Sequence, residues 1–427
     1  MTRRVAIVGS GIAGLSAAHH LRGRAHVTLF EAADYFGGHT HTVDVTLPTA
    51  HGEQTFVVDT GFLVYNERTY PGLIGLFASL GIEVAKTDMS FSVQVPGANG
   101  RNVLEWNGAD LNSVFAQRSN LFKPGFWWML RDILRFNTLA TALAERGNDA
   151  ALMQPLQDFL HEHRFSDRFR DGYLLPMLGC IWSCPTDQML QFPVATMVRF
   201  CHNHGLIQVN HRPQWYTVRG GARHYVEKIV ANVDQALLQT PVRMISRDAN
   251  GVHLHTDSGT QHFDALVLAT HSDQALTLLE QPSLMEQSVL SRIRYHDNRA
   301  VLHTDVRCMP ERKLAWAAWN YERAQHAERE SAQVCLHYWL NRLQPLPFTQ
   351  DVFVSLNPVR TIEPTQVIAE FSYAHPVFDL PAIQAQSEMP ALQGGQRTWY
   401  AGAWMGYGFH EDGLQAGRAA AASLLAS

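Results

Sequence analysis

Residues 3–32 read "RRVAIVGSGIAGLSAAHHLRGRAHVTLFEA", and this stretch decides the fold. Residues 5–8 form a continuous apolar run, as a parallel strand buried on both faces requires. Gly9, Gly11 and Gly14 follow at once and open an alanine-rich segment, and a second apolar run ends at Glu31. The pattern of strand, glycine turn, helix and strand predicts the βαβ unit that begins a Rossmann-type α/β domain.

The glycine turn also predicts a dinucleotide site. Small residues let the backbone approach a pyrophosphate, whose charge the N–H groups of a helix N-terminus favour. Glu31 lies about 20 residues beyond the turn, where a carboxylate can bond a ribose hydroxyl. A glycine motif alone is weak, but the complete βαβ context disfavours a turn that binds nothing. The contacts predicted from this unit are Gly9, Ser10, Gly11, Ile12, Ala13, Gly14, Glu31 and Ala32.

Composition narrows the function classes. A chain of 427 residues predicts two domains or one elaborated domain. A formal charge of −5 argues against nucleic acid as a partner, because no positive field collects phosphates. Charged residues make up 17 %, which indicates a large buried volume or a surface that meets something apolar.

The cysteines point to a reduced compartment. Their number, five, is odd and their spacing gives no disulfide framework. Cys180 and Cys184 have no matching second pair, so we predict no structural zinc there and no metal ligands elsewhere. Residues 1–11 run into a strand rather than a leader, and no stretch approaches the ~20 apolar residues of a spanning helix. We therefore expect a cytoplasmic protein.

Further glycine motifs along the chain identify the dinucleotide. Gly37 and Gly38 follow Glu31 closely, so a second backbone segment can approach the same pyrophosphate. The motifs along the chain are "EAADYFGGHTHTV", "VDTGFLVYN", "VRGGARHYVEKI", "PVRMI", "FDALVLATHSDQAL" and "WYAGAW…GFHEDGLQAGRAAA". With these motifs, the chain resembles the FAD-dependent amine oxidase and phytoene desaturase superfamily.

The resemblance implies an α/β fold with a Rossmann-type FAD-binding domain and an inserted mixed α+β substrate domain. Residues 1–85, 205–285 and 390–427 would form the discontinuous FAD-binding domain. Residues 86–204 and 286–389 would form the substrate-binding domain, with a largely helical pattern between about 86 and 210.

The resemblance also implies that FAD is held without a covalent bond, since no cysteine lies beyond Cys335. His39 stands where the family has an arginine, and Ala403 where it has an acid, so backbone N–H groups would carry more of the pyrophosphate. The further contacts that it implies are Gly38, His39, Thr40, Gly61, Phe62, Val242, Gly402, Ala403, Gly413 and Leu414.

Two histidines are candidate catalytic residues. Amine oxidases of the superfamily carry a lysine on a substrate-domain strand, and the equivalent strand here, "NRAVLHTD", presents His303. One position of their aromatic cage falls on His410. Either histidine suits proton transfer near neutral pH. For His303 the pattern favours the alternative of a strand histidine bonded to a neighbour, whereas for His410 a structural role is an equal alternative. Glu411 and Asp412 are expected to cap the last helix.

Residues 121–136 predict a helix that suits a membrane surface. Its apolar face is flanked by Trp127 and Trp128 and by the cations Lys123, Arg131 and Arg135. A core helix of the substrate domain is the alternative.

The "GFHEDG" ending (residues 408–413) resembles a bacterial subgroup related to enzymes of methylated or cyclopropanated fatty acyl chains, including those that lead to furan fatty acids. It implies an FAD-dependent desaturase of a fatty acid or phospholipid, reoxidised by dioxygen or a quinone. Such an enzyme would contact the inner face of the cytoplasmic membrane peripherally. The alternatives are a flavin amine oxidase, a polyene or carotenoid-type desaturase, and a non-catalytic flavoprotein.

Overall fold

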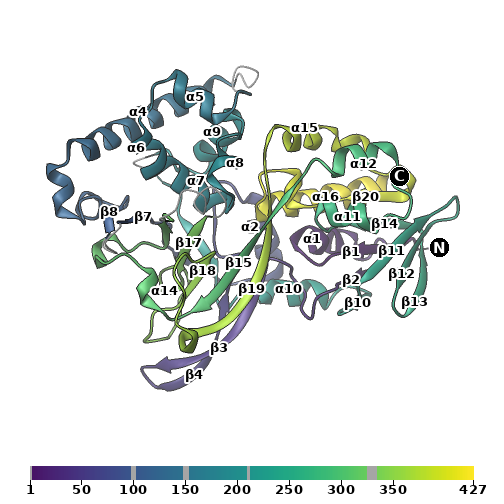
Figure 1. Ribbon diagram of the computed structural model, residues 1–427. Helices are drawn as coiled ribbons and strands as arrows, with labels where there is room; N and C mark the ends of the chain where they lie inside the picture. Colours follow the sequence, from purple (N-terminus) through teal and green to yellow (C-terminus); the bar gives the residue numbers. More distant parts are fainter. Residues whose placement is uncertain (1, 98–101, 148–152, 209–211, 325–333) are drawn as a thin grey trace.

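The molecule has two halves, and the first, which takes strands from both ends of the chain, is built on a five-stranded parallel sheet (Figure 1). The computed structural model describes residues 2–97, 102–147, 153–208, 212–324 and 334–427. The expected βαβ unit is present: α1 (Ile12–Leu21) follows the first strand of the chain and precedes the second, and these two strands pair in parallel. The strand order is β10 (Gln235–Leu237), β2 (His26–Phe30), β1 (Arg4–Val8), β14 (Ala265–Leu268) and β20 (Thr398–Tyr400).

Apolar layers cover both faces of this sheet. One core contains α1 together with α2 (Pro71–Leu80), α10 (Arg223–Val230) and α16 (His410–Ala426). The other contains α11 (Ser272–Leu278) and the small sheet of β11 (Val242–Arg247), β12 (Val252–Thr256) and β13 (Gly259–Phe263). It also includes residues of α12 (Leu284–Leu290) and α15 (Leu380–Glu388), which the domain division by sequence gave mostly to the substrate domain.

A seven-stranded mixed sheet forms the second half of the molecule. One of its N-terminal strands, β7 (Phe91–Pro96), pairs in parallel with β16 (Trp319–Glu322), which lies more than 200 residues later in the chain. Strands β7 and β8 stand where the sequence pattern predicted mainly helix. The order is β19 (Val367–Pro376), β15 (Tyr295–His303), β18 (Phe353–Leu356), β17 (Cys335–Trp339), β16 (Trp319–Glu322), β7 (Phe91–Pro96) and β8 (Asn102–Asn107).

A helical layer covers one side of this sheet, at the upper left of Figure 1. The helix predicted over 121–136 is α4, which begins at Pro124, extends to Arg146 and ends at Gly147 in the left-handed conformation. Phe126, Met129, Phe136 and Ala140 of α4 are buried. The other helices are α3 (Leu111–Val114), α5 (Leu156–Glu162), α6 (Asp167–Phe169), α7 (Leu175–Trp182), α8 (Thr186–Met189) and α9 (Val194–Asn203).

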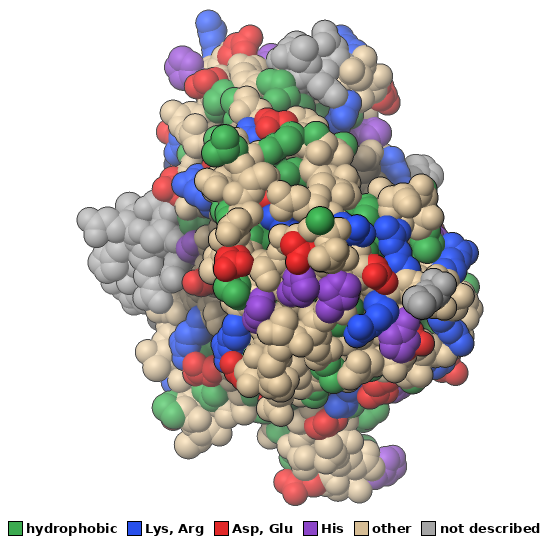
Figure 2. Space-filling model, turned by 90° about the vertical axis from the view of Figure 1, so that its right-hand side faces the viewer, with side chains coloured by type: hydrophobic (Ala, Val, Ile, Leu, Met, Phe, Trp, Pro, Cys, Tyr) green, Lys and Arg blue, Asp and Glu red, His purple; other side chains and the backbone are tan. Residues whose placement is uncertain are grey.

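Shorter strands form two further small sheets. They are β3 (Thr42–Thr49) and β4 (Gly52–Asp59) in one, and β5 (Tyr65–Asn66), β6 (Val84–Thr87) and β9 (Trp215–Val218) in the other. A short helix, α14 (Leu340–Leu343), lies between β17 and β18 in the chain. A 3-10 turn, η1 (Arg118–Phe122), precedes α4. Within the described residues, no helix combines the length and the apolar character needed to cross a bilayer. On the face shown in Figure 2, cationic and acidic side chains are interspersed, as the small net charge suggests.

Candidate active site

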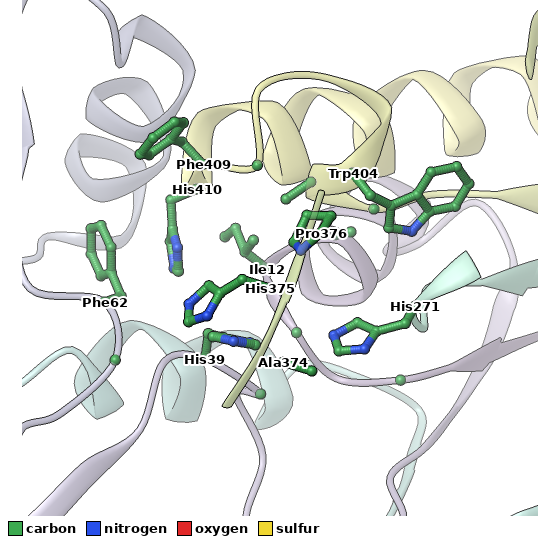
Figure 3. Close-up of a pocket in the computed structure, with 18 of the residues that line it drawn as sticks. Ile12, His39, Phe62, His271, Ala374, His375, Pro376, Trp404, Phe409 and His410 are labelled. Carbon is green, nitrogen blue, oxygen red and sulfur yellow. The ribbon is translucent and has the colours of Figure 1, made fainter. Parts of the chain in front are cut away.

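A cavity of about 770 Å³ lies where the carboxyl ends of the central parallel strands meet the second half of the molecule (Figure 3). Residues that end β1 and β2 and the turn after β14 line it, as ligand sites in open parallel sheets generally do. Residues of β15 and β19 and of α7 and α9 line it from the other half. The cavity therefore spans a nucleotide-binding side and a substrate side.

The glycine turn after β1 leaves room for a ligand at one position and packs tightly at another. A Cβ built on Gly11 would meet no atom within 4 Å. A Cβ on Gly14 would lie 1.9 Å from the Gly9 carbonyl oxygen, so this glycine is required for the turn itself. Gly9 has φ +98°, a conformation that L side chains rarely adopt. Gly11 therefore faces the cavity, whereas Gly14 allows the close packing that the turn requires.

Glu31 is fixed at the tip of β2 by the same loop. Its Oε2 accepts a hydrogen bond from the Ser10 N–H (3.0 Å) and another from the Ser10 hydroxyl. Its Oε1 accepts one from the Ala33 N–H (2.9 Å). The Ser10 Oγ in turn accepts from the Gly37 N–H (3.1 Å). These bonds tie the first glycine turn to the Gly37–Gly38 turn before any ligand arrives.

His39 presents a buried nitrogen without a protein partner. Its Nε2 has no hydrogen bond, and its ring lines the cavity beside those of His271 and His375 (Figure 3). Burial, together with the neighbouring His271, lowers the pKa of His39 to about 4. A buried polar atom without a partner is rare in a complete site, so a ligand group is expected to bond it.

His410 lies in the cavity wall as a neutral ring. Its Nε2 lies 2.9 Å from both the Thr40 Oγ1 and the Tyr225 hydroxyl, which also contact each other. Its ring stacks on Phe62, with centroids 3.7 Å apart (Figure 3). Burial lowers the pKa of His410 to about 3, and His39 adds to the effect. A proton acceptor works best with a pKa near the operating pH, so these contacts suit positioning better than proton transfer.

The two acids after His410 have different roles, which corrects the expectation that both cap the last helix. Asp412 Oδ2 accepts from the Phe409 N–H (2.9 Å) and caps α16, which begins at His410. Glu411 instead accepts from the Gly72 and Leu73 N–H groups, at 2.9 Å each. It therefore caps α2, a helix more than 300 residues earlier in the chain.

His303 is on the predicted strand, β15, but outside this cavity. Its Nε2 lies 2.7 Å from the Ser355 Oγ, and its Nδ1 accepts from the Asp305 N–H (3.0 Å). Both ring nitrogens are thus engaged inside the second sheet. The expectation that His303 stands beside the flavin is wrong, and the alternative of a strand histidine bonded to its neighbours holds.

Most of the predicted cofactor contacts line the cavity together. These are Gly9, Ser10, Gly11, Ile12, Ala13, Glu31, Ala32, Gly38, His39, Gly61, Phe62, Val242, Gly402 and Ala403. Gly14, Thr40, Gly413 and Leu414 are not among the lining residues. Gly413 serves helix packing, because a Cβ there would lie 2.7 Å from the Ile12 Cγ2. His271, Tyr295, His375 and Trp404 line the cavity without having been predicted, although His271 and Trp404 lie in motifs that the sequence analysis quotes.

The substrate side of the cavity is apolar. Among the described lining residues there is no lysine or arginine, and the acids are Glu31 and Asp273, both from the nucleotide-binding half. Glu31 is already bonded to Ser10 and Ala33. The side chains that enclose the substrate side include Met89, Ile181, Phe200, Trp215, Trp319 and Tyr338.

Comparison with known proteins identifies the family. The sequence model described as "Flavin containing amine oxidoreductase" matches residues 12–345. The chain belongs to this family. AofH of Mycobacterium tuberculosis, named as a flavin-containing monoamine oxidase in two strains, is 25% identical over 277 residues. That match covers 62% of this chain but only 56% of AofH.

Two solved structures share the fold of this family member. A CLA-producing fatty acid isomerase from P. acnes superposes with a TM-score of 0.68 at 18% identity, covering 98% of this chain and 97% of the isomerase. Cyclohexylamine oxidase from Brevibacterium oxydans IH-35A gives a TM-score of 0.70 at 17% identity, covering 100% and 99%. At these identities the likeness shows the fold alone.

Membership of a flavin-containing family implies FAD as the cofactor, and the cavity fits it. Open space beside Gly11 suits a pyrophosphate, and Glu31 lies where a ribose is held in such folds. The Nε2 of His39 offers a hydrogen bond that no protein group takes. No cysteine is among the described residues that line the cavity.

Proposed function

We propose that this oxidoreductase removes hydrogen from the acyl chain of a fatty acid or phospholipid, such as a methylated one. The bound FAD supplies the hydride-accepting chemistry. The apolar substrate side of the cavity, with no cation and no unengaged acid among its described lining residues, carries the proposal. Burial of an acyl chain against such side chains is favourable. A charged ammonium would lose its hydration there without gaining a carboxylate partner, which is unfavourable.

The residues of the chain would bind and orient this substrate. Ile181, Phe200 and Trp319 offer contact area and exclude water from the reacting carbon. The neutral imidazole of His410 would hold the Thr40 and Tyr225 hydroxyls in place beside the cofactor site. Dioxygen or a quinone is the proposed electron acceptor. The CLA-producing fatty acid isomerase, which shares this fold, lends support to an acyl substrate.

An amine is the second candidate substrate. The aromatic rings of Phe200, Trp215 and Phe409 line the cavity and could hold a cation against their faces. The similarity to AofH and to cyclohexylamine oxidase also favours an amine. A polyene is a third apolar substrate that the same wall could accept.

Anaerobic reduction of the flavin separates these candidates. Methylated phospholipids, free fatty acids, a carotenoid and primary amines are offered in parallel, and bleaching of the flavin absorbance is followed. We expect reduction by the acyl substrates and recovery of the absorbance in air or with a quinone. Placing a carboxylate in the apolar wall, with Ile181→Asp, should slow reduction by acyl chains at least about tenfold.

Leu314→Asp is the matched control, because Leu314 is 48% exposed and does not line the cavity. Reduction by amines alone would overturn the acyl proposal in favour of the second candidate. A flavin that no substrate class reduces would favour a non-catalytic flavoprotein.

We also propose that the start of α4 rests on the inner face of the cytoplasmic membrane. Phe122 is 86% and Trp128 66% exposed, although both are large apolar side chains. Lys123 and Arg131 are exposed beside them and suit anionic headgroups. The buried residues of α4 form the opposite face, so the helix serves the core and still offers an apolar edge to a bilayer.

Vesicle binding tests this surface. The wild-type protein should sediment with phosphatidylglycerol vesicles, and the double variant Phe122→Ser/Trp128→Ser should bind them at least about tenfold more weakly, because it loses buried apolar area. Leu284→Ser is the control, since Leu284 is 84% exposed but belongs to the opposite half of the molecule. Equal sedimentation of the double variant and the wild type would contradict the proposal.

A further inference from the structure

A buried cluster of metal-ligating side chains lies in the seven-stranded sheet, apart from the cavity. Glu322 ends β16, and Cys335 and His337 belong to the neighbouring strand β17. All three side chains are buried, and one ligand atom from each lies within 4.8 Å of the other two. None of the three lines the flavin cavity.

We propose that Glu322, Cys335 and His337 bind one Zn²⁺ ion. The Cys335 Sγ lies 3.5 Å from the His337 Nε2, which lies 3.0 Å from the Glu322 Oε2. Ligand atoms of a tetrahedral zinc site lie roughly 3.2–3.7 Å from one another, given metal bonds of about 2.0–2.3 Å. The set combines thiolate, imidazole and carboxylate ligands, which zinc accepts together and which magnesium and calcium do not favour.

Two of the three proposed ligands are each held by a second residue. The His337 Nδ1 lies 2.6 Å from the Ser355 Oγ, which leaves its Nε2 facing Glu322 and Cys335. The Arg360 Nε donates to the Glu322 Oε1 (2.8 Å), so the other carboxylate oxygen faces the cluster. Such outer partners orient the ligands in established zinc sites.

His303 completes this outer layer. Its Nδ1 accepts from the Asp305 N–H, so its Nε2 carries the proton and donates to the Ser355 Oγ. The serine oxygen has two lone pairs and can also accept from the His337 Nδ1. Without a metal, a proton lies between the His337 Nε2 and the Glu322 Oε2, and a cation that displaces it would meet the unprotonated nitrogen with which imidazole binds a metal. The arrangement gives His303 a positioning role in place of the flavin chemistry expected of it.

The charges of the cluster are compatible with a divalent cation. One carboxylate and one thiolate balance Zn²⁺, and Arg360 adds a positive charge beside Glu322. The side chain of Cys308 also interacts with His337, so rotation of that thiol, or a water, can fill the fourth position. A metal here would join β16 to β17 and stabilise the sheet without touching FAD.

Metal content and a cobalt titration test the site in the FAD-loaded enzyme. We expect about one zinc per chain after purification. After chelation, added Co²⁺ should give thiolate-to-cobalt charge transfer and tetrahedral ligand-field bands to the red of the flavin absorption. Cys335→Ser should weaken Co²⁺ binding at least about hundredfold, and Ser355→Ala about 10- to 100-fold, with the flavin content unchanged.

Cys201→Ser is the matched control, because Cys201 is a fully buried cysteine outside the cluster. It should retain metal. The wild-type titration needs no variant, so misfolding of Cys335→Ser would not affect it. Absence of zinc together with absence of thiolate-to-cobalt charge transfer would overturn the proposal, as would unchanged Co²⁺ affinity in Cys335→Ser. Binding at surface histidines, such as the neighbouring rings of His253 and His262, would lack the thiolate signal and count against it.

Discussion

Replacement of Gly11 by alanine is expected to remove FAD and to leave the fold intact. The added methyl group would meet no protein atom within 4 Å, so folding has no steric obstacle. It would instead occupy the space into which a pyrophosphate must come to reach the N-terminus of α1. We expect FAD affinity to fall at least about 100-fold, equivalent to about 2.8 kcal/mol. The flavin-to-protein ratio and titration of the apoprotein with FAD measure the loss.

Variants at two further glycines distinguish an effect on FAD binding from an effect on folding. Gly75→Ala is the control, since a Cβ there also meets nothing within 4 Å and Gly75 does not line the cavity. It should keep FAD. Gly14→Ala places its Cβ 1.9 Å from the Gly9 carbonyl oxygen, so this variant should lower the thermal stability of the apoprotein as well. A Gly11→Ala enzyme that binds FAD normally would show that the pyrophosphate does not approach this turn.

Acidification is expected to destabilise the folded protein by a few kcal/mol between pH 6 and pH 5. Burial is the main cause that lowers the pKa of His39 and of His204 to about 4, and that of His375 and of His410 to about 3. Unfolded imidazoles take up a proton near pH 6.5. Below that pH the unfolded chain holds more protons, so stability falls by about 1.4 kcal/mol per pH unit for each such group.

Two carboxyl groups oppose this trend. Burial raises the pKa of Asp59 and that of Asp412 to about 6, so the folded state takes up their protons first. The two carboxyl groups therefore offset part of the loss of stability that the histidines cause between pH 6 and pH 4. Because four histidines oppose two carboxyl groups, the net effect between pH 6 and pH 5 is a loss.

Urea unfolding of the FAD-loaded enzyme at several pH values measures the net slope. His204→Phe should reduce that slope by about 1.4 kcal/mol per pH unit, because one titrating group is removed. The exposed His51→Gln is the control. Stability that stays constant or rises from pH 6 to pH 5 would contradict the prediction.

The nucleotide-binding half of the site could be predicted from sequence because its contacts are local. Residues 3–32 contain the strand, the turn, the helix and the acid that meet in β1, α1 and β2. Ser10 and Glu31 are 21 positions apart, and the crossover between β1 and β2 brings the acid back to the turn. Family motifs pointed to Phe62, Val242 and Gly402, and the three segments that carry them reach the same cavity.

The roles of the remaining polar residues depended on contacts across the whole chain. His303 meets Ser355 and His337 because β15, β18 and β17 are neighbours in the second sheet. Glu411 caps a helix whose Gly72 lies 339 residues earlier, and the sequence around His410 does not indicate this contact. Cys335 and His337 have an ordinary strand spacing, and only pairing with β16 brings Glu322 beside them.

The sequence by itself determined the Rossmann-type unit and the FAD-binding turn, because short-range periodicity and glycine sterics decide those. The tertiary structure alone decided which histidine lies at the cavity, which acid caps which helix, and where a metal could bind. These outcomes rest on sheet order and burial, which join residues hundreds of positions apart. Burial also gave His410 its lowered pKa, a property that no neighbouring residue in the sequence indicates.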